Sequence, residues 1–455
     1  MKSMNDGNTL KDWFKVIDKI HPFNSGNLSQ TPSKDRAIAN AVYEIRETFR
    51  NYKIDMSYFY DKFYVYQEGY WNEINEELME IFLRDCTRNI YKAHMNFHTS
   101  NFYKSLKETF RDELRIISHS NDEKVLLNCS NFTLEFYKNE IKSRAHSKKD
   151  YMIYKLKYDY NQKATSPMWD SFLNEMLPDV DQQLLLHQFI GYTFTNHIKL
   201  EKALYLYGEG GNGKSVVQEV VTKLLGEENT SSVSIGKLTK DENAVMLIEG
   251  KLLNYCSENE KTLGLNQFKS LVSGEPVIGK KLYRDVRFVK KYAKLMFNLN
   301  SLPKISDEKH SYMRRLLILS FNKKPKVIDP ELHFKIINAE LSGIFNRVID
   351  ALVILLKEKK FVKYKELDEI FKDYNYDNDL IQQYIDEAIE KGFPEGATKV
   401  SELHQYYVTF CKNHGEKHEA LVTFAKELGK KGYEKLKRKG GSYYDLEVEG
   451  GSYFS

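Results

Sequence analysis

The sequence predicts an α/β protein of several domains with a largely parallel sheet at its centre. Four short apolar runs recur at 203–207, 251–256, 294–299 and 315–321, with polar or helical segments between them. A glycine-rich turn follows the first run and opens an apolar-periodic stretch. Short apolar strands separated by helices are typical of a parallel sheet that is buried on both faces.

Length and composition set limits on the class of protein. A chain of 455 residues exceeds one compact core, so about two to four domains are expected. No stretch reaches the roughly eighteen uncharged apolar residues of a membrane-spanning helix, and the N-terminus lacks an apolar signal-peptide core. The 4 cysteines are scattered, with no C-x-x-C pair, which favours free thiols in a reducing, cytoplasmic setting.

Three domains are expected, at 1–165, 166–375 and 376–455. The first alternates amphipathic helical patches such as 72–94 with aromatic stretches such as 62–71, which indicates a helix-rich α+β domain. Further helices are expected in the central domain at 166–177, 182–195 and 343–360.

The glycine-rich turn, GEGGNGKS, fits the phosphate-binding pattern G-x-x-x-x-G-K-[ST] over 208–215. Its glycines would let backbone N–H groups point at phosphate oxygens, and the helix N-terminus adds its positive end. Lys214 would contact the β- and γ-phosphates of ATP, and the Ser215 hydroxyl would bind Mg²⁺. The alternative is a chance glycine-rich turn. The expected nucleotide-binding residues are Gly208, Gly211, Asn212, Gly213, Lys214 and Ser215.

Polar residues follow the next two strands at the places where such a site needs them. Glu258 and Glu260 follow the run at 251–256, and a carboxylate there would hold Mg²⁺ or polarise the attacking water. Asn300 follows the run at 294–299 and could orient water or sense the γ-phosphate. Both also suit ordinary solvated turns. Which glutamate is the main catalytic carboxylate stays open.

Two adjacent arginines, Arg314 and Arg315, open the fourth run. An arginine beside a buried strand is unusual unless an anion lies nearby. In a ring of subunits, Arg315 could reach the γ-phosphate bound by a neighbour, with Arg314 as the alternative if the strand begins one residue earlier.

In this order, the motifs resemble those of superfamily 3 helicases, in the primase–helicase group of phages and plasmids that includes satellite-phage and staphylococcal pathogenicity-island replication proteins. The resemblance covers roughly residues 60–455 and rests on GEGGNGKS, SENE, FKSLVSGEPVIGKKLYRD, FNLNSLPKI and YMRRLLILSF. Asn300 and Arg315 have the spacing of that family's sensor asparagine and arginine finger. The match is weaker where the group often has Asn-Gly and this chain has Asn131-Phe132. Too few residues precede the matching region for priming activity to be carried over.

The resemblance implies an AAA+-type ATPase core that uses ATP and Mg²⁺. It also implies a DNA helicase and replication initiator of a mobile element, which acts as a homohexameric ring, opens origin DNA with 3′–5′ polarity and works beside a separate primase. The segment around 277–289 would be the hairpin of the central channel. Its strands could pair across a turn that places Lys280, Lys281 and Arg284 near the tip. A solvated basic hairpin is the plain alternative.

The C-terminal segment resembles a winged helix. Residues 426–439 hold seven lysines and arginines against two glutamates, a local excess that the net charge of +4 conceals. Cations of this kind would bind duplex phosphates without reading the sequence, and a basic surface with no role in DNA binding is the alternative. The expected DNA-binding residues here are Lys430, Lys431, Lys437, Arg438 and Lys439.

Other functions remain as alternatives. One is an origin-binding initiator that uses ATP as an assembly switch without processive unwinding. Another is a P-loop kinase, which would not need the basic hairpin or tail. Cys411, His414 and His418, with His404 nearby, have metal-like spacing, but a structural zinc site usually has paired cysteines, and zinc is not expected.

Overall fold

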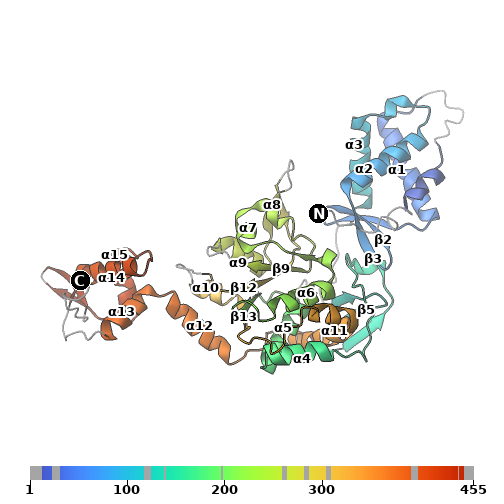
Figure 1. Cartoon of the computed structure of the whole chain (residues 1–455). Helices are drawn as coiled ribbons and strands as arrows, with labels where there is room; N and C mark the ends of the chain where they lie inside the picture. Colours follow the sequence, from blue (N-terminus) through green and yellow to red (C-terminus); the bar gives the residue numbers. More distant parts are fainter. Residues whose placement is uncertain are drawn as a thin grey trace.

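The chain forms an elongated molecule in which a helical N-terminal lobe and a small C-terminal unit flank a central α/β body (Figure 1). The computed structural model describes residues 13–22, 31–116, 124–137, 140–195, 198–258, 264–280, 286–303, 309–390, 398–438 and 440–444.

The central body is built on a five-stranded parallel sheet with the order β13-β7-β12-β9-β8. Each of the four apolar runs forms one of its strands, which confirms the parallel sheet; the short β8 was not predicted. The strands are β7 (Ala203–Tyr207), β8 (Thr230–Ser231), β9 (Leu253–Glu258), β12 (Lys294–Leu299) and β13 (Leu316–Ser320). The sheet is almost fully buried, as runs without alternation require.

Helices cover the sheet, and the longest of them is α11. They are α4 (Pro167–Met176), α5 (Val180–Tyr192), α6 (Lys214–Leu225), α7 (Ile235–Lys240), α8 (Glu242–Val245), α9 (Leu265–Ser273), α10 (Lys309–Met313) and α11 (Leu332–Glu358), with the 3₁₀ turn η4 (Glu227–Asn229). The two helices expected before the glycine-rich loop are confirmed as α4 and α5. Helix α11 begins well before the predicted start at 343. Gly343 therefore lies inside the helix and does not start it. A Cβ at this position would lie 2.0 Å from the Thr165 carbonyl oxygen, so the glycine permits close packing of the helix against that carbonyl.

The N-terminal lobe is the expected mixture of helices with a small sheet. Its elements are η1 (Trp13–Lys19), α1 (Lys34–Asn51), β1 (Met56–Phe59), β2 (Lys62–Gln67), β3 (Tyr70–Ile74), α2 (Glu76–Ile90), η2 (Met95–Phe97) and α3 (Ser100–Leu114). Helix α2 is shorter than the predicted 72–94, because Asn75 caps it: its Oδ1 accepts a hydrogen bond from the Glu77 N–H at 2.8 Å.

A second antiparallel sheet links this lobe to the central body. It consists of β4 (Val125–Asn128), β5 (Thr133–Tyr137) and β6 (Glu140–Arg144), followed by the 3₁₀ turn η3 (Lys148–Asp150). Its buried side chains, such as Leu127 and Leu134, belong to the core of the central body, while the lobe has its own core. The boundary between these two hydrophobic cores therefore lies before this sheet, and the domain limit at residue 165 remains a prediction.

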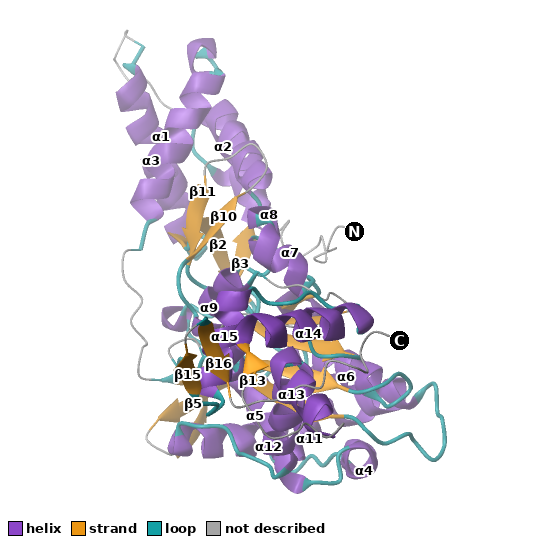
Figure 2. Ribbon diagram, turned by 90° about the vertical axis from the view of Figure 1, so that its left-hand side faces the viewer, coloured by secondary structure: helices purple, strands orange, loops and turns teal. Residues whose placement is uncertain are grey.

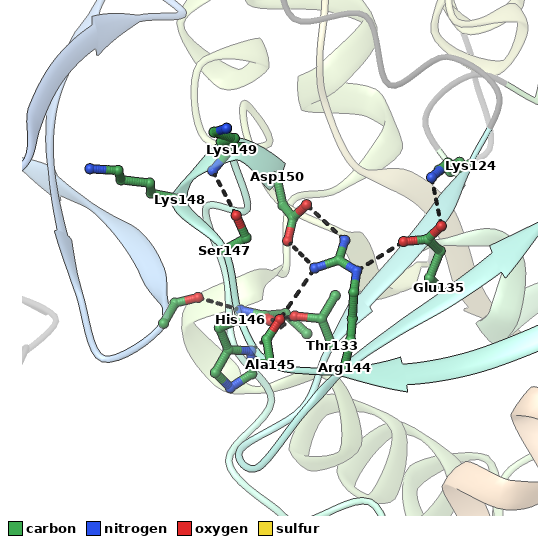
Figure 3. Close-up of polar contacts among 12 residues, drawn as sticks. Lys124, Thr133, Glu135, Arg144, Ala145, His146, Ser147, Lys148, Lys149 and Asp150 are labelled. Carbon is green, nitrogen blue, oxygen red and sulfur yellow. Dashed lines mark hydrogen bonds and ion pairs between the residues drawn. The ribbon is translucent and has the colours of Figure 1, made fainter.

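An ion-pair cluster fixes the end of this second sheet (Figure 3). The Arg144 guanidinium donates to both carboxylate oxygens of Asp150 at 2.8 Å and to Glu135 at 2.9 Å. These contacts hold Arg144 in a charged state and raise its pKa, chiefly through the hydrogen bonds to Asp150. Because the Trp71 indole N–H donates to the Lys148 carbonyl, the same corner joins the lobe to the body.

The C-terminal unit has its own small core, which contains Tyr407, Phe424 and Tyr444. Its elements are α13 (Leu380–Glu390), β14 (Thr398–Lys399), α14 (Val400–Asn413), α15 (Leu421–Lys430), β15 (Lys435–Arg438) and β16 (Gly441–Tyr444), and α12 (Glu366–Asp377) leads to it. The predicted order of two helices and a hairpin is confirmed. Among the described residues, no helix is long and apolar enough to cross a membrane.

Candidate nucleotide site

The glycine-rich loop leaves β7 at Gly208, which lies between two neighbouring strands. Its N–H donates to the Leu299 carbonyl at 3.1 Å, at the end of β12. Its φ is +150°, and a Cβ would lie 2.3 Å from the Phe321 carbonyl oxygen, just after β13. Only glycine fits a backbone this close to its neighbours.

The middle of the loop is locked by one buried amide. Asn212 donates from Nδ2 to the Phe321 carbonyl and accepts at Oδ1 from the Lys214 ammonium at 3.0 Å. Gly211 and Gly213 have φ values of +76° and +83°, the left-handed region that glycine favours. The loop thus curls back on itself before α6 begins at Lys214.

Lys214 is 7% exposed, and neutral oxygens surround its ammonium group. Nζ donates to the carbonyls of Gly208 and Glu209, the latter at 3.0 Å, as well as to Asn212. Burial lowers the pKa of Lys214. Since these partners carry no net charge, they leave the positive charge available to an anion. Ser215, the next residue, is exposed.

A pocket of about 990 Å³ opens beside this loop. The loop and the start of α6 form one wall, and α4 forms another through residues that include Met168 and Phe172. The segment after β13 contributes Val327 and Ile328, which are 80% and 82% exposed. The pocket thus has a polar end at the loop and an apolar end between α4 and the segment after β13, as ligand sites usually do.

Asn300 is exposed and lines the same pocket as Lys214, so the structure brings these two predicted residues together. Asn298, which the sequence reasoning missed, is buried two residues earlier on β12. It donates to Gln218 on α6 at 2.9 Å and accepts from the Tyr255 hydroxyl at 2.9 Å. The period-two spacing of the two asparagines was the available signal, since alternate residues of a strand share a face.

The two glutamates are only partly placed. Glu258 ends β9 and pairs in register with Leu299 of β12, at the same sheet edge as the loop. Its side chain lies outside the described part of the chain, as does the whole of Glu260. Their predicted roles at Mg²⁺ and water remain predictions.

The two arginines differ sharply in their surroundings. Arg315 is 8% exposed and donates to the Ser311 carbonyl at 2.7 Å and to the Ser273 hydroxyl at 3.2 Å, with Glu201 at 3.4 Å. These partners occupy the side chain within its own subunit, whereas Arg314 is exposed. The role of Arg315 at a neighbour's nucleotide remains a prediction, and the exposed Arg314 remains its alternative.

The predicted hairpin is confirmed as β10 (Val277–Lys280) paired antiparallel with β11 (Val286–Val289). Lys280 is exposed at its outer end. Lys281 and Arg284 lie in the turn at 281–285, outside the described residues.

The predicted DNA-binding cations of the C-terminal unit fall into two groups. Lys437 is exposed, and Lys430 pairs with Glu427 on its own helix. Lys431 is only 17% exposed and contacts Asp379 at 2.5 Å and Gln382 at 3.0 Å. These contacts tie α15 to the start of α13, and the predicted role of Lys431 in DNA binding remains a prediction. The side chain of Arg438 and the whole of Lys439 are outside the described residues.

The candidate metal-like residues of this unit have other partners. Cys411 is buried, and His404 contacts the Glu419 carbonyl through Nε2 at 2.8 Å. Within the described ranges, no group of three or more His, Cys, Asp or Glu side chains is arranged to hold a metal ion.

Comparisons with known proteins match two separate segments of the chain. Residues 37–178 match a family model described as D5 N terminal like, and residues 206–315 match the family of unknown function DUF5906. The second match runs from β7 through the glycine-rich loop to Arg315.

Two solved apo structures of the C-terminal region of NrS-1 are similar in fold. Each has a TM-score of 0.51 and covers 89% of this chain and 98% of that chain, at 13% and 14% identity. The chain thus contains a D5 N terminal like segment and a DUF5906 segment, within a fold similar to that of the NrS-1 C-terminal region.

Proposed function

We propose that this protein is an ATP- and Mg²⁺-dependent DNA helicase, a replication initiator of a phage- or plasmid-like mobile element that acts as a hexameric ring. The observation that carries the proposal is the Lys214 ammonium, which borders a pocket of about 990 Å³ where β7 ends. A cation held by neutral oxygens at a helix N-terminus favours a polyphosphate ligand.

The nucleotide would lie along this pocket. Its phosphates would meet the loop N–H groups and Lys214, and its base would lie between α4 and the segment with Val327 and Ile328. Ser215 and the carboxylate of Glu258 would hold Mg²⁺, which neutralises charge on the β- and γ-phosphates when bound. Asn300 would orient the attacking water from the end of β12.

DNA would be bound at two places. The hairpin β10–β11, with Lys280 at its outer end, would contact a single strand, and the C-terminal unit would bind duplex origin DNA through exposed cations such as Lys437. The match to a D5 N terminal like model and the fold shared with the NrS-1 C-terminal region support a role in replication.

The decisive variant is Lys214→Ala, which we expect to abolish ATP hydrolysis and strand displacement but to retain duplex binding. Lys223→Ala is the matched control, because Lys223 lies on the same helix and pairs with Glu227 at the surface. Turnover is measured with and without DNA. Normal turnover by Lys214→Ala protein would remove the nucleotide assignment.

A second candidate is an origin-binding initiator that uses ATP only as an assembly switch. The C-terminal unit has a hydrophobic core of its own, which supports this candidate. A unit that folds around its own core could bind duplex DNA without any unwinding by the central body. Strand displacement on a forked duplex separates this function from a helicase, and DNA-stimulated hydrolysis separates both from a kinase. An image of the particle with ATP and DNA would test the ring directly.

A further inference from the structure

A second pocket, of about 720 Å³, lies between the N-terminal lobe and the hairpin. The β1–β2 turn forms one side, and residues in and after β11 form the other, in agreement with the proximity of β2, β3, β10 and β11 in Figure 2. We propose that this pocket binds single-stranded DNA. The inference rests on the proposed function and specifies a place where the lobe would hold the unwound strand.

The lining combines aromatic rings with cations. The rings are those of Tyr58, Phe59, Tyr60, Tyr64 and Phe288, and the cations are Lys62, Arg115, Arg287, Lys290 and Lys291. Aromatic faces stack with any base, while cations follow the phosphates, so this combination suits single strands without sequence preference. A duplex hides its bases within the stack and cannot use the rings.

The lining of the pocket holds more cations than carboxylates, and two of these cations, Lys62 and Arg115, also pair with carboxylates outside the lining. Five cations face two carboxylates, those of Asp61 and Glu249. Arg287 contacts both carboxylates, at 3.5 Å and 2.5 Å, and is thereby neutralised. Lys290 and Lys291 are exposed directly after β11, where a phosphate backbone can reach them.

Tyr60 supplies an independent observation. It forms a two-residue turn with Asp61 between β1 and β2, and both residues have positive φ, at +50° and +58°. Such turns favour Asn, Asp or Gly, and a bulky aromatic residue in this region is an outlier. Backbone strain of this kind persists at sites where the side chain has a function.

The surroundings of Tyr60 suit a stacking role. The Lys291 ammonium lies 4.3 Å from its ring centroid and donates to its hydroxyl, and the Phe59 ring packs edge-on at 5.2 Å. A base that stacks on Tyr60 would therefore bring its phosphate towards Lys291. Since Lys291 follows β11, the strand would contact the lobe and the hairpin segment together.

The test measures binding of full-length protein to fluorescently labelled oligothymidine, without nucleotide. Tyr60→Asn places a favoured residue in the turn, so we expect thermal stability at least equal to that of the parent but about tenfold weaker binding. Tyr60→Phe keeps the ring and should keep the affinity. Tyr43→Asn, at a site 59% exposed on α1, is the control and should bind as the parent does.

A second arm tests the phosphate contacts. Lys290→Ala and Lys291→Ala should each reduce the slope of log affinity against log salt by about 0.7, the value for one single-strand phosphate. Because no hydrolysis is measured, these results are independent of whether Lys214 supports ATPase activity.

Three results would overturn the inference. Parental affinity in Tyr60→Asn would exclude stacking at this turn. Weaker binding in both Tyr60→Asn and Tyr60→Phe, with a lower Tm in each, would show that the hydroxyl contact to Lys291 only fastens the lobe to the body. An equal loss of affinity for blunt duplex would show that the pocket does not select single strands.

Discussion

The two edges of the central sheet use cations in different ways. At the carboxyl edge, Lys214 borders the large pocket together with the neutral polar groups of Ser257, Asn298 and Asn300. At the amino edge, a cation precedes or opens each of four strands: Lys202 before β7, Lys251 before β9, Lys294 in β12 and Arg315 before β13.

The amino-edge cations have partners within the chain. Lys202 and Lys251 donate to the carbonyls of Arg314 and Glu228, and the Lys294 ammonium lies 4.2 Å from the centre of the Tyr192 ring. Burial lowers the pKa of all three lysines, that of Lys294 to about 8. Burial alone therefore does not distinguish Lys214 from these three lysines; the pocket beside it does.

The largest effect should separate the two neighbouring arginines. If Arg314 reaches the nucleotide of the next subunit, Arg314→Ala should lower turnover by about 10³-fold without lowering stability. Arg315→Ala should instead lower the free energy of unfolding by about 2 kcal/mol, since it leaves the Ser273 and Glu201 groups without their partner. ATPase assays and urea denaturation measure the two effects.

Mixing provides the control for this arginine pair. Arg314→Ala protein mixed with Lys214→Ala protein should regain part of the activity, because some interfaces then combine an intact loop with an intact arginine. Full activity of a monomer at high dilution would contradict both the ring and this role.

The next effect concerns Lys294 and has a defined pH dependence. Its pKa is about 8 in the folded chain, against about 10.4 when unfolded, so the unfolded state binds the proton more tightly. Below pH 8 the folded chain buries a charged Lys294, and this lowers the free energy of unfolding by the full amount. The loss becomes smaller as the pH rises from 8 towards about 10.4, because the folded chain then holds a neutral lysine. Lys294→Met should raise the free energy of unfolding by about 3 kcal/mol near pH 7.

Denaturation of parent and Lys294→Met protein at several pH values tests this expectation. The difference between them should shrink steadily as pH rises above 8. A difference that is constant with pH would mean that packing against Tyr192, and not the charge, sets the effect.

At the carboxyl edge, Glu258→Gln should lower hydrolysis by at least about 100-fold while nucleotide binding persists, because an amide cannot carry the charge towards Mg²⁺ or activate water. Binding of a fluorescent ATP analogue and turnover are measured together. If Glu260→Gln is the more damaging variant, the two roles are reversed.

The smallest expected effect concerns two lysines of the C-terminal unit, one exposed and one paired within the chain. Lys437→Ala should weaken duplex binding severalfold and reduce its salt slope by about 1. Lys431→Ala should leave the slope unchanged and lower the stability of the unit by about 1 kcal/mol, because it breaks the ion pair with Asp379. Equal slopes for both variants and the parent would remove Lys437 from the DNA surface.

The sequence predicted those features that depend on local patterns. The four apolar runs predicted the parallel strands because a buried strand needs no long-range information to be apolar. The glycine-rich loop was recognisable because few residue types allow its backbone. The sequence ranked Arg315 before Arg314 without sight of Ser273 and Glu201, which contact Arg315 and are distant from it in sequence. Likewise, nothing local links Lys431 to Asp379, or β4–β6 to the central core.

The long helix α11 has a mechanical consequence. It spans 27 residues, or about 40 Å, and its first residues, Leu332 and His333, line the nucleotide pocket. Gly343, pressed against the Thr165 carbonyl, lies about 17 Å from the start and about 23 Å from the end. If α11 tilted as a rigid body about Gly343, its C-terminal end would move about 1.4 times as far as its N-terminal end at the pocket. The chain then continues through α12 to the C-terminal unit, so α11 has the proportions of a lever between the pocket and that unit (Figure 1).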